Sequence, residues 1–230
     1  MGIVIFAFRK RNFTTMSNLP SNIPEKTIER LSEYRRTLLR CHKQGITHIF
    51  SHVLAGMHGI TAVQVRRDLM LIGFSSDTKK GYDVKVLIDF ISSILDSESP
   101  MNIGVIGMGH LGQAITKYFN SKDLKLKITA AFDIDDQKVG TMIDGIPVFH
   151  MSEFEDRVAE LGVNIVVLSS PARVASDLVV PIINAGIKGV LNFTSKPLNL
   201  PHGIVVENYD ITTLLEKVAY FVKENEEKDI

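Results

Sequence analysis

Residues 101–112 read MNIGVIGMGHLG, a mostly apolar run that passes directly into closely spaced glycines. Gly107, Gly109 and Gly112 have the G-x-G-x-x-G spacing of a dinucleotide-binding turn. The first glycine permits a tight turn, the second lets a pyrophosphate approach the backbone, and the third lets the next helix pack closely on the strand. The unpaired N–H groups at the start of that helix would face the phosphates. The stretch therefore predicts a strand, a sharp turn and a helix.

An acidic residue follows at the distance that such a site needs. Asp133 ends a second apolar run, 128–133, about twenty residues beyond the glycines. We expect its carboxylate to bind the adenosine ribose and to repel a 2′-phosphate, which favours NAD(H) over NADP(H). The expected nucleotide site comprises Gly107, Met108, Gly109, His110, Leu111, Gly112 and Asp133. The alternative is an ordinary glycine turn beside a solvated acid.

Strand-like and helical segments alternate through the rest of the C-terminal half. Strands are predicted at 146–149, 164–168, 189–193 and 204–206, and helices at 152–160, from 171 to about 185 and at 212–224. This alternation indicates a doubly wound parallel sheet. Ligands lie at the carboxyl ends of such strands, so Ser169, Ser170 and Asn192 are candidate nucleotide contacts. Ordinary polar turn residues are an equally good interpretation of these three.

The composition indicates a globular protein with an uneven charge distribution. Of 230 residues, 45% are hydrophobic and 23% charged, and the net charge is zero. Residues 1–99 carry fourteen Lys or Arg against nine Asp or Glu, whereas 100–230 carry twelve against seventeen. A basic half suggests an anionic partner, although basic helices are also common in small domains. Cys41 is the single cysteine, which fits a reducing compartment, and we expect a cytoplasmic protein without a membrane span.

The N-terminal half has the pattern of a helix-turn-helix. Helices are predicted from Pro24 to about Lys43 and at 51–57, followed by a turn and a third helix capped by Thr61. In the third helix one face is apolar, formed by Ala62, Val65, Leu69 and Ile72. A polar segment at 73–83 is a candidate β-wing, and a fourth helix is expected at 84–95. The polar linker 96–100 marks the domain boundary.

The polar face of the third helix is a candidate surface for reading DNA. Glutamine and arginine contact base edges in the major groove, and arginine and lysine also bind phosphate. The expected contacts are Thr61, Gln64, Arg66 and Arg67 from the helix, and Lys79 and Lys80 from the wing. A three-helix bundle with a solvated basic face is the alternative.

Taken together, the two halves resemble the Rex family of bacterial redox-sensing transcriptional repressors. The matching stretches are 61–69 (TAVQVRRDL), the glycine motif, 132–135 (FDID), 185–193 (AGIKGVLNF) and 206–210 (VENYD). The resemblance implies an α/β protein with an N-terminal winged-helix domain at 21–96 and a Rossmann domain at 101–209. It also implies a homodimer that exchanges a C-terminal helix, 210–230. Residues 1–20 are expected to be a disordered or non-native extension, since Met16 is a possible natural start.

Rex proteins bind palindromic operators in double-stranded DNA when NADH is scarce and leave them when NADH binds. The resemblance therefore implies that this chain senses the ratio of NADH to NAD⁺. It places the coupling on three residues: Arg36 in the first helix, Tyr118 in the first Rossmann helix, which also touches the cofactor, and Asp210 before the last helix. A charge-assisted contact between Arg36 and Asp210 would join the two domains.

The sequence departs from the family pattern in the wing and near the nicotinamide. Residues 76–82 read SDTKKGY and lack the usual wing arginine, and Ile211 stands where some members have phenylalanine. Two alternatives stay open: a nucleotide-binding regulator whose altered wing has lost DNA binding, and, from another class of protein, a small dehydrogenase with a helical accessory domain.

No catalytic or metal-binding group is expected. His150 and His202 are candidate proton donors by residue type only, and no nucleophile–base grouping stands out. The pairs His48–His52 and Cys41–His42 have no convincing third and fourth ligand for a metal.

Overall fold

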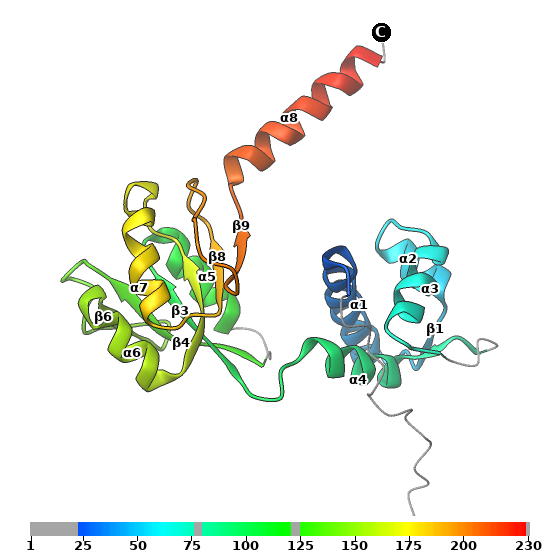
Figure 1. Cartoon of the computed structure of the whole chain (residues 1–230). Coiled ribbons are helices and arrows are strands. Elements are labelled where there is room, and N and C mark those ends of the chain that lie inside the picture. The colour runs from blue at the N-terminus through cyan, green and yellow to red at the C-terminus, as the bar shows by residue number, and fades with distance from the viewer. Residues whose placement is uncertain (1–22, 76–79, 121–124, 229–230) are drawn as a thin grey trace, which may run out of the picture. The chain divides into compact units, whose positions relative to one another are not determined.

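The computed structural model describes residues 23–75, 80–120 and 125–228, and the expected extension 1–20 lies outside these ranges. The chain forms two compact units that meet in the sequence between Asp96 and Ser97 (Figure 1). Each unit has its own hydrophobic core.

The first unit is helical with a small two-stranded sheet. Its elements are α1 (Glu25–Lys43), β1 (His48–Ile49), α2 (Ser51–Met57), α3 (Ala62–Leu71), β2 (Tyr82–Asp83) and α4 (Val84–Leu95). β1 and β2 pair antiparallel, with His48 opposite Asp83 and Ile49 opposite Tyr82. This pairing closes the base of the predicted wing, whereas positions 76–79 lie outside the described residues.

Side-chain caps fix where two of these helices begin. The Thr61 hydroxyl accepts a hydrogen bond from the Gln64 N–H at 3.2 Å, as expected for the start of α3. Asp83 caps α4 in the same way, accepting from the Val86 N–H at 3.0 Å. α1 begins one residue later than predicted: Pro24 is its cap, with an extended ψ of 140°, and Glu25 is its first helical residue.

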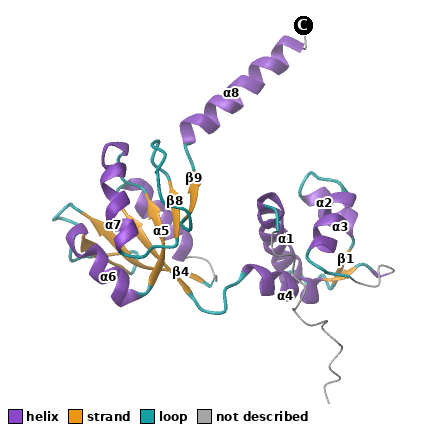
Figure 2. Ribbon diagram, in the orientation of Figure 1, coloured by secondary structure: helices purple, strands orange, loops and turns teal. Residues whose placement is uncertain are grey.

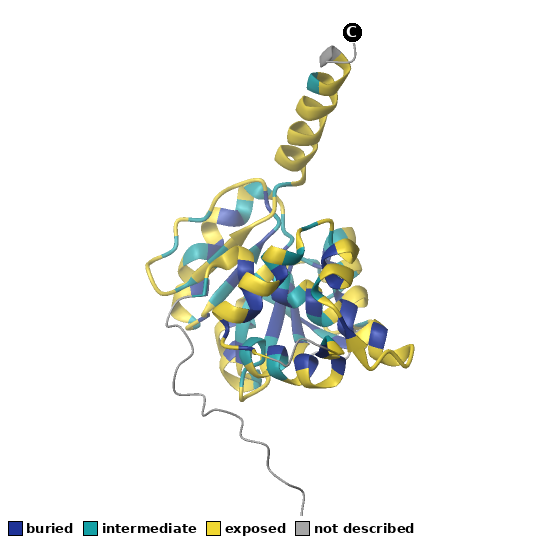
Figure 3. Ribbon diagram, turned by 90° about the vertical axis from the view of Figure 1, so that its right-hand side faces the viewer, coloured by how far each residue is buried: buried dark blue, intermediate teal, exposed yellow. Residues whose placement is uncertain are grey.

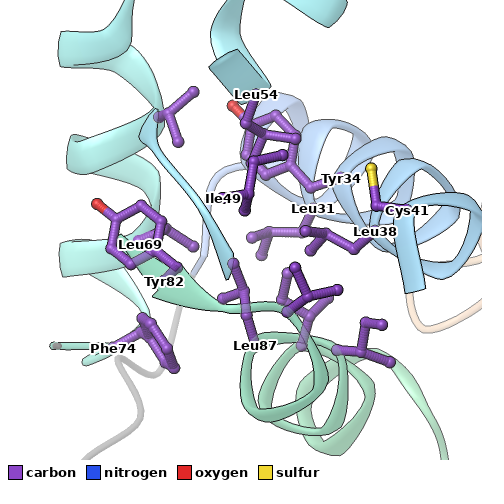
Figure 4. Close-up of a cluster of buried hydrophobic side chains, with 14 of the residues drawn as sticks. Leu31, Tyr34, Leu38, Cys41, Ile49, Leu54, Leu69, Phe74, Tyr82 and Leu87 are labelled. Carbon is purple, nitrogen blue, oxygen red and sulfur yellow. The ribbon is translucent and has the colours of Figure 1, made fainter. Parts of the chain in front are cut away.

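Apolar side chains from all four helices form the core of the first unit (Figure 4). Leu31 and Leu38 of α1, Leu54 of α2, Leu69 of α3 and Leu87 of α4 are each at most 1% exposed. Each such side chain contributes about 1.5–3 kcal/mol on burial, so this cluster holds α3 against the other helices.

The second unit is built on a seven-stranded sheet flanked by helices. Its elements are β3 (Met101–Ile106), α5 (His110–Asn120), β4 (Leu126–Asp133), β5 (Met142–Ile143), β6 (Ile146–His150), α6 (Phe154–Leu161), β7 (Val163–Leu168), α7 (Val179–Asn184), β8 (Gly189–Asn192), β9 (Val205–Asn208) and α8 (Ile211–Lys228). The strand order is β5-β6-β4-β3-β7-β8-β9, and the pairs from β6 to β9 are all parallel. Without the antiparallel edge strand β5, this is the 3-2-1-4-5-6 order of a Rossmann fold. The predicted doubly wound sheet is therefore confirmed.

Helices cover both faces of the sheet (Figure 2). α6 and α7 pack on one face, where Phe154 and Ile182 join a cluster with Phe132. α5 packs on the other face, where Ile115 contacts the cluster that includes Val105. The strand order reverses beside β3, because β4 and β7 flank it on either side. A ligand crevice is expected at the carboxyl ends of these strands.

Other details also differ from the sequence-based expectations. The short strands β1 and β5 were not predicted, since two residues carry no periodicity. The helix expected from 171 to 185 is divided into a 3₁₀ segment, η4 (Ala172–Leu178), and α7. Pro181 accounts for the division, because its missing N–H is tolerated only in the first turn of an α-helix.

α8 follows β9 in the chain, and almost all of its described residues are exposed (Figure 3). Leu215 is 64% exposed, Val218 60% and Phe221 51%. Among the described residues, no helix combines the length and the apolarity that crossing a membrane requires.

The core of the first unit can be tested on α4 with two neighbouring residues. Leu87→Ala should lower the free energy of unfolding by about 2–5 kcal/mol, because this leucine is fully buried. Val86→Ala is the control: Val86 is 41% exposed, so the change should stay within roughly 0.5 kcal/mol. Urea unfolding of both variants measures the difference, and equal values would contradict the packing described for α4.

Candidate functional site

The turn between β3 and α5 leaves no room for a side chain at its first glycine. Gly107 has a φ of +93°, which L-residues rarely adopt. A Cβ there would lie 2.9 Å from the Ser170 backbone nitrogen, at the carboxyl end of β7. The turn and the end of β7 are thus in direct contact.

The other two glycines of the motif differ in their surroundings. A Cβ on Gly112 would lie 2.1 Å from the Gly107 carbonyl oxygen, so the first turn of α5 touches the backbone of the glycine turn. A Cβ on Gly109 would meet nothing within 4 Å. Gly112 therefore serves packing, while the space beside the Gly109 backbone is open.

The residues that begin α5 present backbone N–H groups at this open position. By helix geometry, the first turn from His110 has no intrahelical acceptors for its N–H groups. The Met108 side chain is fully buried and anchors the turn, whereas that of His110 is exposed and that of Leu111 half-buried. Such a helix start attracts an anionic ligand.

Asp133 ties the glycine turn to the end of β4. Its Oδ2 accepts a hydrogen bond from the Met108 N–H at 2.7 Å, and its Oδ1 accepts from the N–H groups of Ile134 and Asp135 at 2.8 and 3.0 Å. The carboxylate is therefore held in place before any ligand arrives. This is a structural role that the sequence did not indicate, in addition to the expected contact with a ribose.

Lys138 lies beside Asp133, a contact that the sequence did not indicate. Its Nζ lies 3.5 Å from Asp133 Oδ2 and 3.0 Å from Asp135 Oδ2. The hydrogen bond to Asp135 raises the pKa of Lys138, and the same bond lowers the pKa of Asp135. The lysine offsets part of the negative charge that was expected to repel a 2′-phosphate. Its position three residues beyond Asp135 was the available signal.

The three polar residues predicted at the strand ends have different surroundings. Ser169 Oγ donates to the Gly107 carbonyl at 2.7 Å and so supports the turn. Ser170 Oγ is buried and has no hydrogen-bond partner among the described residues. The Asn192 side chain is fully occupied internally, donating to Asn208 Oδ1 at 2.8 Å and to the Lys196 carbonyl at 2.9 Å, and accepting from Thr194. Of the three, Ser170 is the one whose side-chain oxygen has no hydrogen-bond partner among the described residues.

In the first unit, α3 presents an exposed stripe on the side opposite its core face. Val63, Arg66, Arg67 and Met70, spaced at i, i+3, i+4 and i+7, are all exposed. Arg66 Nη1 also donates to Ser51 Oγ at 3.0 Å, which links α3 to the start of α2. Gln64 differs from the expectation, because it is half-buried at the flank of this stripe.

A buried acidic residue on α3, Asp68, was not recognised from the sequence. Its carboxylate accepts two hydrogen bonds from Arg30 of α1, both at 2.7 Å, and one each from Tyr34 at 2.8 Å and Gln64 at 2.9 Å. Burial alone raises the pKa of Asp68, but these hydrogen bonds outweigh it and hold the pKa below its usual value. Burial and the bond to Asp68 raise the pKa of Tyr34. Removal of either Arg30 or Asp68 would leave the other charge without its partner in the interior, which is strongly destabilising.

The predicted wing and switch residues are placed as follows. Lys79 lies outside the described residues, and Lys80 is exposed beside the base of the wing. Arg36 is exposed on α1 in the first unit. Tyr118 is 54% exposed on α5 in the second unit. Asp210 caps α8, since its carboxylate accepts from the Thr212 N–H at 3.1 Å and from the Thr213 hydroxyl at 2.8 Å.

Within the parts of the chain that the structure describes, no group of three or more His, Cys, Asp or Glu side chains is arranged to hold a metal ion. Of the candidate proton donors, His150 is bonded to Ser152 Oγ at 2.7 Å.

Two family models match the chain, one on each unit. The model described as "Putative DNA-binding protein N-terminus" matches residues 22–69, which include α1, α2 and most of α3. The model described as "CoA binding domain" matches residues 98–196, which include the glycine turn and the strands from β3 to β8.

Curated relatives match almost the whole chain. A redox-sensing transcriptional repressor Rex from Leuconostoc citreum (strain KM20) is 36% identical over 200 residues, which are 87% of this chain and 93% of that protein. Another, from Anoxybacillus flavithermus (strain DSM 21510 / WK1), is 35% identical over 90% of this chain and 98% of its own length. This chain belongs to the Rex family.

Solved structures of a Rex-family repressor, RSP, share this architecture. RSP in complex with β-NADH is 30% identical over 91% of this chain and 99% of its own, with a TM-score of 0.79. RSP in complex with β-NAD⁺ and operator DNA is 30% identical over 91% of this chain and 97% of its own, with a TM-score of 0.81. The resemblance to the Rex family noted in the sequence is confirmed.

The different roles of two glycines in this Rex-family turn can be separated by stability. Gly112→Ala should lower the free energy of unfolding by about 3 kcal/mol or more, since the methyl group collides with the Gly107 carbonyl. Gly109→Ala enters open space and should change it by less than roughly 0.5 kcal/mol. Thermal and urea unfolding of both variants measure this. A tolerated Gly112→Ala would show that α5 does not need its close approach.

Proposed function

We propose that this protein is an NADH-responsive transcriptional repressor, which binds a palindromic operator in double-stranded DNA and leaves it when NADH binds. The observation that carries the proposal is a likeness spanning both units, over about nine tenths of the chain, to a repressor whose structures hold NADH in one case and NAD⁺ with operator DNA in another. A match confined to the second unit would fit any nucleotide-binding enzyme.

The nucleotide site in this proposal lies at the open backbone of Gly109, at the carboxyl end of β3. The pyrophosphate lies against the open backbone at Gly109 and the N–H groups that begin α5, and the ribose contacts Asp133. The unpaired Ser170 hydroxyl supplies a further hydrogen bond. Three internal hydrogen bonds to Asp133 set the carboxylate in advance, which reduces the entropy lost on binding. Discrimination between the reduced and the oxidised cofactor follows from the ring, because the cationic form loses more hydration in an apolar pocket.

The DNA-binding surface in this proposal is the exposed stripe of α3. Arg66 and Arg67 are solvent-exposed and positively charged, so they suit phosphate or guanine contacts in the major groove. Thr61, at the start of the helix, and Lys80, beside the wing, lie on the same unit and extend this surface. Gln64 at its flank is the remaining base-reading side chain.

We assign the dimer interface to α8 and the surface near it. The exposed apolar residues of α8 have no cover within the second unit. A cavity of about 570 Å³ also lies at the amino ends of β7, β8 and β9, lined by residues that include Ile165, Leu191 and Val205. Exchange of α8 between two chains would bury both surfaces, and two-fold symmetry matches a palindromic operator.

The switch requires that NADH bind one arrangement of the dimer more tightly than the other. Moving an equilibrium from 1:99 to 99:1 takes a difference in affinity of about 10⁴-fold. We propose that Arg36, Tyr118 and Asp210 carry this difference. The carboxylate of Asp210, which caps α8 in the structure, would exchange its partners for Arg36 in one arrangement and for Tyr118 in the other.

This function makes the protein a regulator and not an enzyme. A dehydrogenase needs a proton donor beside the nicotinamide. His150 is engaged with Ser152 at the end of β6, which is separated from β3 by β4, and His202 is exposed before β9. A repressor acts where its operator is, so we also propose a cytoplasmic location.

NADH-dependent release can be measured by titrating the protein with palindromic duplexes that it selects from a randomised library, at fixed salt. NADH should weaken binding of the wild type by at least tenfold. Gly109→Val should bind the same DNA but ignore NADH, because its branched side chain fills the open position at the turn. Steady oxidation of NADH with a carbonyl compound would favour the dehydrogenase, and unchanged NADH binding by Gly109→Val would remove the turn from the site.

The α8 interface can be tested by placing the same charge at two neighbouring positions. Val218→Glu should convert the dimer to a monomer in sedimentation experiments and weaken DNA binding, because Val218 lies on the apolar face. Lys217→Glu, one residue earlier, should leave the dimer intact. A dimeric Val218→Glu variant would place the interface elsewhere.

A further inference from the structure

Gln64, at the flank of the exposed stripe of α3, is a predicted base-reading residue whose side chain is also hydrogen-bonded to a buried group. Its Nε2 donates to Asp68 Oδ1 at 2.9 Å, one helical turn along the same helix. Asp68 is 2% exposed and is itself held by Arg30 and Tyr34. The amide is therefore hydrogen-bonded to a buried carboxylate that Arg30 and Tyr34 hold in place.

The chemistry of a carboxylate determines which way the amide faces. An ionised carboxylate only accepts hydrogen bonds, so the amide must turn its nitrogen, and not its oxygen, toward Asp68. One N–H of Gln64 is then used, and the second N–H and Oε1 remain for a ligand. A glutamine side chain that contacted only solvent would have no preferred amide orientation, because its two orientations are nearly equal in energy.

We infer that Asp68 locks the amide of Gln64 so that α3 reads an adenine, which rests on the proposed DNA-binding function. Adenine presents an N6 donor next to the N7 acceptor in the major groove, which matches one acceptor and one donor on Gln64. Guanine presents two acceptors, so its O6 would face Oε1 of the locked amide. Asp68 is a positioning residue here, and Gln64 makes the contact.

The buried Asp68 carboxylate also connects Gln64 to α1. Arg30 lies on α1 and donates both its Nε and its Nη2 to Asp68. Such a bidentate pair of hydrogen bonds is more directional than a single hydrogen bond. The orientation of Gln64 is thus defined relative to α1 as well as to α3.

The test compares base preferences of the full-length protein on the randomised palindromic library, together with the salt dependence of affinity. The wild type should prefer adenine over guanine at one position of each half-site by roughly 5- to 150-fold. Gln64→Ala should abolish that preference and leave the salt dependence unchanged. Asp68→Asn should reduce the preference for adenine over guanine, because an amide at this position also donates and no longer fixes Gln64.

Two further variants separate positioning from general stability. Tyr34→Phe removes a donor to Asp68 Oδ2 without touching the Gln64 contact, so it should lower stability but keep the base preference. Arg67→Ala should weaken binding to all sequences and reduce the salt dependence by about one phosphate contact. If Asp68→Asn does not fold, Gln64→Ala still decides the base contact.

The outcomes distinguish this inference from the function on which it rests. Failure of the wild type to select any sequence would refute the proposed repressor. A wild type that selects sequences, with Gln64→Ala keeping the same preference at every position, would overturn the inference alone. A folded Asp68→Asn variant with an unchanged preference would show that Gln64 reads its base without the lock.

Discussion

The close contact between the start of α5 and the glycine turn is the constraint on which the second unit depends. The Gly112 backbone lies so near the Gly107 carbonyl that a single methyl group does not fit. This contact sets the angle at which α5 leaves β3, and so it places the first N–H groups of the helix at the carboxyl end of β3. The turn is also fixed from the side by Asp133 and Ser169, which bond to its backbone. The surface at this turn is thus made of backbone that side chains hold in place.

In the first unit a charge pair, and not a backbone contact, sets the relative orientation of two helices. α3 is held on α1 by apolar burial around Leu31 and Leu69, which is strong but not directional. The bond between Arg30 and Asp68 adds direction. A buried ion pair of this kind adds little net stability, because desolvation offsets most of the attraction. Its value is that α1 and α3 keep one relative orientation.

How much of the structure the sequence predicts depends on how far apart in the chain the interacting residues lie. Local patterns were sufficient for the helix cap at Thr61, for the turn at Gly107 and for the Rossmann alternation of strands and helices. Asp68 was not found, because its partners Arg30 and Tyr34 lie more than thirty residues away and only the fold brings them together. Such a contact leaves no mark in the spacing of residues along one helix.

The polar residues at the strand ends show the same limit within the candidate site. Ser169, Ser170 and Asn192 have equivalent positions in the sequence pattern, at or just after a buried strand, and the pattern could not rank them. The structure ranks them by their hydrogen bonds, since Asn192 is saturated by its neighbours and Ser170 has none. Lys138 was missed for a different reason. A lysine in a turn is ordinarily solvated, so the sequence did not suggest that it pairs with Asp133 and Asp135.

The rigidity of both units bears on how a nucleotide could control DNA. A ligand shifts a two-state equilibrium only by its difference in affinity for the two states, and packed cores do not deform continuously. Because Arg30 and Asp68 fix α1 to α3, a displacement of α1 would turn α3 with it. A signal therefore needs to reach only α1, the helix that carries Arg36. Under the proposed function, the element that changes is the proposed contact between two copies of the chain through α8, whose apolar side chains are exposed, and not the interior of either unit.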